Sequence, residues 1–105
     1  FSSDLVFDGA TDVPYRESDR VQPLNVYGHS KAEAEHRVMA LDPKALVIRT
    51  SAFFGPWDRA NFVTHALERL AARQPLRARS DVTVSRTYVP DVVDATLDLL
   101  VDGAG

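Results

Sequence analysis

The alternation of extended and helical segments constrains the fold of this 105-residue chain more than any other feature. Branched and aromatic residues predict strands at 1–7 and 45–50, and a short alternating stretch predicts another at 76–79. Apolar residues that recur at every third or fourth position predict helices at 25–41, 60–73 and 90–102. Because strands and helices take turns, we expect an α/β fold in which helices flank a parallel sheet, organised as a single domain over 1–105.

Local signals set the ends of these helices and their buried faces. Asp42-Pro43 ends the first helix, Pro75 stops the second, and Pro90 opens the third. Residues 82–89 are expected to be extended. The apolar stripe expected to be buried on the first helix comprises Val26, Tyr27, Ser30, Ala34, Val38 and Leu41. Glu33 and Arg37 are expected to form an ion pair on the solvent-exposed face of this helix.

Charge and composition exclude several classes of protein. The net charge of −3 argues against a nucleic-acid partner. The chain has no cysteine, so disulfides and thiolate metal sites are excluded. No apolar run approaches the ~20 residues of a membrane span, and a cytoplasmic location is the default expectation. The histidines at 29, 36 and 65 lack metal-ligand spacing, and we expect no metal site.

The first helix places Tyr27 and Lys31 four residues apart, on the same face. A lysine ammonium beside a tyrosine favours the phenolate and lowers the tyrosine pKa from its ordinary value near ~10. Such a phenol can donate and recover a proton near neutral pH. The pair alone is also compatible with a half-buried aromatic ring beside a solvated lysine.

Polar residues at the carboxyl ends of the predicted strands mark a candidate site, because ligands of α/β sheets gather there. Ser3 and Asp4 belong to the first strand, and they are either site residues or caps of a turn. Residues 50–57 follow the second strand, and they form either a pocket wall or packing at the end of the core.

Two features predict that this chain is a fragment of a longer polypeptide. It begins at Phe1, without an initiator Met and with a strand already under way. It also contains no glycine-rich turn between a strand and a helix that could hold a pyrophosphate.

Four motifs, in order, resemble the dTDP-4-dehydrorhamnose reductase family of extended short-chain dehydrogenases. They are 2–9 (SSDLVFDG), 14–17 (PYRE), 23–31 (PLNVYGHSK) and 48–51 (IRTS), with 61–63 and 85–88 similar to later segments. The resemblance implies a partial Rossmann-like sheet that lacks its N-terminal dinucleotide-binding half. It also implies an NADPH-dependent reductase of 4-keto nucleotide sugars, with NADH as the alternative cofactor.

The resemblance also implies roles for individual residues. Tyr27 would donate a proton to the keto oxygen, Lys31 would hold the nicotinamide ribose, and Ser3 would polarise the carbonyl with support from Asp4. The remaining implied positions are Thr50 and Ser51 beside the cofactor, and Ala52, Phe53, Asn61 and Arg86 on the substrate side.

This sequence departs from the family pattern at three positions, which limits the transfer of residue roles from the family. Leu5 replaces a tyrosine, Ala52 a tryptophan and Arg86 a proline. Two alternatives therefore stay open, an epimerase or dehydratase of the same superfamily and a non-catalytic nucleotide-sugar-binding or regulatory module. Without the cofactor-binding region the isolated chain is expected to be inactive. Its exposed sheet edge also makes a second copy a candidate partner.

Overall fold

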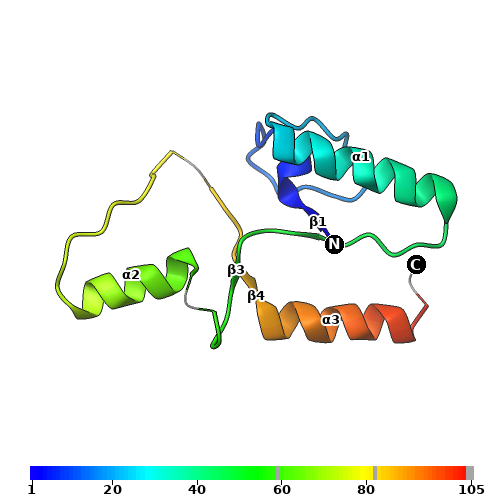
Figure 1. Ribbon diagram of the computed structural model, residues 1–105. Coiled ribbons are helices and arrows are strands. Elements are labelled where there is room, and N and C mark those ends of the chain that lie inside the picture. The colour runs from blue at the N-terminus through cyan, green and yellow to red at the C-terminus, as the bar shows by residue number, and fades with distance from the viewer. Residues whose placement is uncertain (59, 82, 104–105) are drawn as a thin grey trace. The chain divides into compact units, whose positions relative to one another are not determined.

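The computed structural model describes residues 1–58, 60–81 and 83–103, and Figure 1 shows the order of their helices and strands. The elements in chain order are β1 (Ser2–Ser3), the 3-10 helix η1 (Asp4–Val6), α1 (Val26–Leu41), β2 (Arg49–Thr50), β3 (Phe53–Phe54), α2 (Phe62–Ala71), β4 (Thr87–Tyr88) and α3 (Val89–Val101). They form two compact units. The first contains residues 1–50 and the chain from Leu100 onward, and the second contains residues 51–99.

The first unit is built on one pair of parallel strands. Ser2 lies opposite Arg49 and Ser3 opposite Thr50, and the Ser2 amide also donates to the Ile48 carbonyl at 2.7 Å. Helix α1 packs on both β1 and η1. Val6 of η1 is the only apolar side chain among the described residues that is fully buried. The small core of this unit therefore lies where η1 meets the start of α1.

The second unit repeats this arrangement with another parallel pair. Phe53 lies opposite Thr87 and Phe54 opposite Tyr88, and the Phe54 and Tyr88 rings are 5.2 Å apart between centroids. The Thr87 amide donates to the Ala52 carbonyl at 2.9 Å. Helix α2 packs against β3, and α3 begins directly after β4.

The α/β class and the parallel strand pairing are confirmed, but the strands differ from the prediction. The described strands form two separate pairs, so a single Rossmann-like sheet is not confirmed. The strand predicted at 1–7 ends after Ser3, because the Ser3 hydroxyl accepts the Leu5 amide and turns the chain into η1. Of the residues predicted as a strand at 45–50, only the last two form one, which is β2. The residues predicted as a strand at 76–79 do not form one.

The helices agree with the prediction to within about two residues at each end. Of the segment expected to be extended at 82–89, residues 87–88 form β4 and Val89 already belongs to α3, while Val82 lies outside the described residues.

The prediction that an apolar stripe of α1 is buried is wrong. Val26 and Leu41 are 86% and 88% exposed, and the buried residue of this helix is Gly28. The faces predicted to be buried on α2 and α3 are also largely exposed, as at Leu67 and Leu97. The physical reason is size: a pair of two-residue strands and one 3-10 turn cannot cover the whole apolar face of a 16-residue helix.

No helix in the described ranges is both long and apolar enough to cross a lipid bilayer.

Candidate active site

The start of α1 is determined by two local features. The Asn25 side chain accepts the Gly28 amide at 2.7 Å, which caps the helix and begins it at Val26. Gly28 also lies directly against η1. A Cβ atom at this position would overlap the carbonyl oxygen of Leu5 and lie 2.9 Å from the Pro23 Cβ. Only glycine therefore allows the first turn of α1 to contact η1 so closely.

Tyr27 and Lys31 lie on this first part of α1, as predicted. The Lys31 Nζ is 5.7 Å from the centroid of the Tyr27 ring and donates to the Phe1 carbonyl at 3.4 Å. The Tyr27 side chain is half exposed. The two side chains thus share one face of the helix, beside the strand that carries Ser3.

Ser3 and Asp4 form a local hydrogen-bonded cap. The Ser3 hydroxyl is buried, accepts the Leu5 amide at 3.1 Å and donates to the Asp4 carboxylate at 3.2 Å. The sequence left a site role and a capping role open, and the structure shows the capping contacts. The Ser3 proton is directed at an exposed carboxylate, so its orientation depends on Asp4.

Thr50 lies across the strand pair from Ser3, at the carboxyl end of β2. Its hydroxyl is 3.5 Å from the Ser2 carbonyl, to which it donates a long hydrogen bond. Parallel pairing therefore brings Ser3 and Thr50 to the same end of the β1–β2 sheet, as expected for ligand-binding positions of an α/β fold.

The remaining predicted residues belong to the second unit. The Ser51 amide donates to the Thr87 hydroxyl at 3.2 Å, while the Ala52 and Phe53 side chains are exposed. Asn61 caps α2: it accepts the Thr64 amide at 2.9 Å and donates to the Asp58 carbonyl at 2.8 Å. The predicted site is thus described in two halves, one in each unit.

Arg86 is exposed and lies over an aromatic ring at the start of α2. The centre of its guanidinium is 4.8 Å from the centroid of the Phe62 ring. A guanidinium in such a cation–π contact can still donate its N–H groups to an anion, because the ring offers them no hydrogen-bond acceptor oxygen. Arg86 and Asn61, which the sequence analysis predicted on the substrate side, therefore both lie at the start of α2.

An ion pair that the sequence analysis missed connects α1 to β2. Arg49 binds both carboxylate oxygens of Glu35, with Nε–Oε1 and Nη2–Oε2 distances of 2.9 and 2.7 Å. These hydrogen bonds hold the pKa of the Glu35 carboxyl below its ordinary value, against the opposing effect of burial. The signal in the sequence was an arginine within an apolar strand. The predicted pair of Glu33 and Arg37 is also present, at 2.8 Å, but it is exposed.

Arg49 also contacts the segment that precedes α1, through the Phe7 ring. Its guanidinium lies 5.0 Å from the centroid of the Phe7 ring, and Phe7 stacks on Tyr15 at 4.1 Å between centroids. The Tyr15 hydroxyl donates to Asp8 at 3.0 Å. The pKa of the Tyr15 phenol is raised, first by its loss of hydration and second by this hydrogen bond. The Arg49 guanidinium thus lies between the Phe7–Tyr15 stack and the Glu35 carboxylate in the contacts it makes.

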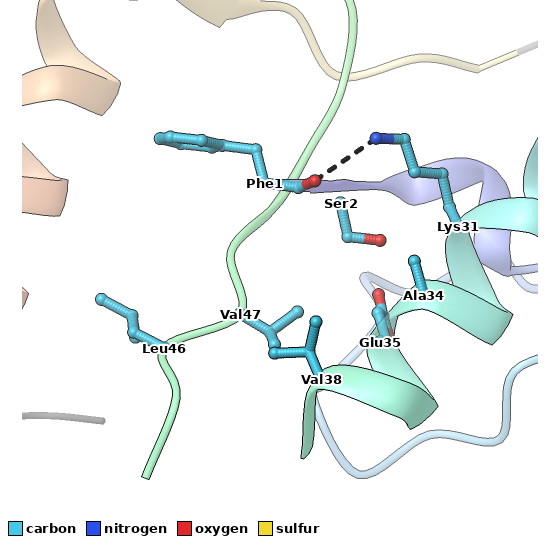
Figure 2. Close-up of a pocket in the computed structure, with 8 residues that line it drawn as sticks. All are labelled: Phe1, Ser2, Lys31, Ala34, Glu35, Val38, Leu46 and Val47. Carbon is cyan, nitrogen blue, oxygen red and sulfur yellow. Dashed lines mark hydrogen bonds between the residues drawn. The ribbon is translucent and has the colours of Figure 1, made fainter. Parts of the chain in front are cut away.

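A small cavity of about 100 Å³ lies between β1, α1 and the segment that leads into β2 (Figure 2). Its wall is mainly apolar, and its polar residues are Ser2, Lys31 and Glu35. The buried Ser2 hydroxyl has no hydrogen-bond partner of good geometry within the described part of the chain, although it is close enough to Glu35 to help lower its pKa.

Within the described residues, no group of three or more His, Asp or Glu side chains is placed to hold a metal ion.

Comparison with known proteins places these residues in context. A family model described as RmlD substrate binding domain matches residues 1–104. The dTDP-4-dehydrorhamnose reductase of Aggregatibacter actinomycetemcomitans is 38% identical over 98 residues, which cover 93% of this chain and 33% of that protein. The corresponding reductase of Mycolicibacterium smegmatis is 38% identical over 104 residues, or 97% of this chain and 31% of that protein.

A third relative comes from an archaeon. The probable low-salt glycan biosynthesis reductase Agl14 of Haloferax volcanii is 36% identical over 104 residues, which cover 95% of this chain and 35% of that protein. The chain thus spans about a third of the length of these relatives and matches their C-terminal part. No solved structure matches it significantly.

Proposed function

Because this chain belongs to the RmlD substrate binding domain family, we propose that it is the catalytic and substrate-binding portion of an NADPH-dependent reductase of 4-keto nucleotide sugars. The membership confirms the resemblance that the motifs indicated. Relatives named as dTDP-4-dehydrorhamnose reductases support this substrate class. Their additional length supports a preceding segment that completes a Rossmann-like sheet and holds the pyrophosphate of the cofactor.

The observation that carries the proposal is the placement of Tyr27 and Lys31. Their side chains share the face of α1 that begins beside Ser3, with the ammonium 5.7 Å from the ring centroid. In the proposed reaction the Tyr27 hydroxyl protonates the keto oxygen, because Tyr27 is an exposed phenol beside the Lys31 ammonium. Ser3 donates to the same oxygen when its proton turns away from Asp4.

The residues of the first unit fit a nicotinamide ribose. Lys31 carries three N–H donors, and the hydrogen bond to Phe1 is long at 3.4 Å. The ammonium therefore has donors to spare for ribose hydroxyls. Thr50 and Ser51 follow at the end of β2, on the cofactor side. When bound, the nicotinamide supplies the hydride that reduces the sugar carbon.

On the substrate side, Ala52 and Phe53 would face the sugar and Arg86 would bind the diphosphate. Asn61 differs from the other three, because its side-chain oxygen and nitrogen both serve the start of α2. We therefore assign Asn61 the role of positioning the helix beside Arg86.

A chimera tests the proposal. The part of the Aggregatibacter actinomycetemcomitans reductase that precedes the matched region would be joined to this chain. We expect NADPH oxidation that depends on dTDP-4-dehydrorhamnose, with one cofactor consumed for each sugar reduced. An epimerase would convert the sugar without net NADPH consumption, and a binding module would hold it without turnover. Either result would overturn the proposal.

A further inference from the structure

Lys31 and Glu35 are four residues apart on α1 and line the same cavity, as Figure 2 shows. Oppositely charged side chains at this spacing on a helix attract each other. An ion pair with Glu35 would draw the Lys31 ammonium along the helix, away from Tyr27. The structure shows another arrangement, in which Lys31 contacts the Phe1 carbonyl and lies over the Tyr27 ring.

Arg49 explains this arrangement. It occupies both oxygens of the Glu35 carboxylate through two charge-assisted hydrogen bonds of 2.9 and 2.7 Å. The side chains of Arg49 and Glu35 are only 23% and 12% exposed, so water competes weakly for this contact. The guanidinium also lies over the Phe7 ring, 5.0 Å from its centroid.

We propose that Arg49 is a positioning residue that withholds Glu35 from Lys31, and so keeps the Lys31 ammonium directed at Tyr27 and the cofactor. The importance of that placement rests on the proposed function, but the placement itself does not. Glutamate is ionised at neutral pH. Without Arg49, the Glu35 carboxylate would be an unpaired anion one helical turn from Lys31.

The acylation rate of Lys31 measures this competition directly. The chain contains only two lysines, Lys31 and Lys44, so Lys44 serves as an internal reference in the same peptide map. In the 105-residue chain at constant pH, Arg49→Gln should slow the labelling of Lys31 relative to Lys44 by about twofold to fivefold, as expected of a partly exposed ion pair. Acetic anhydride with mass-spectrometric readout is the probe.

Two further variants separate positioning from simple support of the fold. Glu35→Gln alone should leave Lys31 labelling within about twofold of the parent, because the competitor is gone. The double variant Glu35→Gln/Arg49→Gln should return it to the parent rate. If the pair only stabilised the fold, the two single changes would act alike and the double change would not restore the rate.

The chain offers a matched control. Arg37→Gln breaks the Arg37–Glu33 pair of the same helix, whose length of 2.8 Å is similar, and should leave Lys31 labelling unchanged. If Arg49→Gln unfolds the first unit, labelling will accelerate, and Arg49→Lys then decides. This variant keeps the charge but not the bidentate contact with Glu35. Slower labelling of Lys31 supports the proposal, and an unchanged labelling rate overturns it. No step of this test depends on reductase activity, so its failure is distinct from failure of the proposed function.

Discussion

Helices α1 and α2 begin with the same kind of N-cap, but different contacts hold the two helix starts in place. Each is capped by an asparagine whose side-chain oxygen accepts the amide three residues later, at Gly28 in α1 and at Thr64 in α2. In α2 the Thr64 hydroxyl joins the cap, donating to the Asp58 carbonyl at 3.1 Å and accepting from Asn61 at 3.0 Å. In α1 the same position is a glycine that contacts the Leu5 carbonyl across the fold.

The two helix starts are therefore positioned by different kinds of contact. The side chain at the third position of α2 closes a local network, so the segment from Asp58 to Thr64 organises itself. The absence of a side chain in α1 lets its backbone meet η1, which carries Asp4 and follows Ser3. The helix that bears Tyr27 and Lys31 is therefore placed by tertiary contact, and the helix beside Arg86 by local hydrogen bonds.

The sharpest way to break this comparison is to remove the acid from α1. In the chimeric reductase, Tyr27→Phe should lower kcat by about 10²–10⁴-fold, because positioned acid catalysis contributes that much. Tyr88→Phe removes a hydroxyl from the second unit and should leave kcat within about twofold of the parent, as it contributes no positioned acid. Steady-state NADPH oxidation measures both. Similar losses in the two variants would show that the chemistry is not concentrated at the start of α1.

The next largest effect should come from the third position of each helix. Gly28→Ala should lower the free energy of unfolding of the first unit by about 1–3 kcal/mol, because the new methyl group overlaps the Leu5 carbonyl. Thr64→Ala should cost the second unit about 1 kcal/mol through its lost hydrogen bonds. Hydrogen exchange of amides in each unit measures the two separately. A stabilised Gly28→Ala variant would mean that the contact with η1 does not limit α1.

The caps themselves should have nearly equal effects. Asn25→Ala and Asn61→Ala should each cost about 1 kcal/mol in their own unit, because each leaves one helix amide without its partner. The amides of Gly28 and Thr64 should exchange faster in the respective variant. If either variant also accelerated exchange in the other unit, the two helix starts would not be independent.

The smallest effect concerns acid sensitivity. The pKa of Glu35 is lower in the folded chain than its unfolded value near ~4.3, so folded Glu35 binds a proton less readily. Its contribution to stability is present above that value and is lost as the pH falls through the folded pKa. Circular dichroism between about pH 5 and pH 2 should therefore show a steeper loss of helix for the parent than for Glu35→Gln.

The second unit supplies the control for this pH dependence. Arg79 and Asp81 form a contact of the same length, 2.7 Å, and it too lowers the pKa of the carboxyl. Both side chains are largely exposed, so water and salt screen the pair. Asp81→Asn should leave the acid transition unchanged. An equal shift in the two variants would mean that burial of Glu35 contributes nothing.

Much of the candidate site could be predicted because its signals are local. Tyr27 and Lys31 share a helix face by spacing alone, and Glu33 pairs with Arg37 for the same reason. The capping alternative for Ser3 also depended on its immediate neighbours, and the hydrogen bonds to Leu5 and Asp4 are within two residues. What could not be predicted in this way is which surface of each helix the rest of the chain covers.

Local signals in the sequence are enough to predict the α/β class, the approximate helix ends and the face shared by Tyr27 and Lys31, since turn residues and helical periodicity act over three or four positions. Tertiary contacts alone establish that Gly28 meets Leu5, that the described strands form two separate pairs, and that Arg49 binds Glu35. These contacts join residues 14 or more positions apart, as in the pair of Glu35 and Arg49. Their formation depends on how strands pair and on which charges are sheltered from water, and neither leaves a periodic trace in the chain.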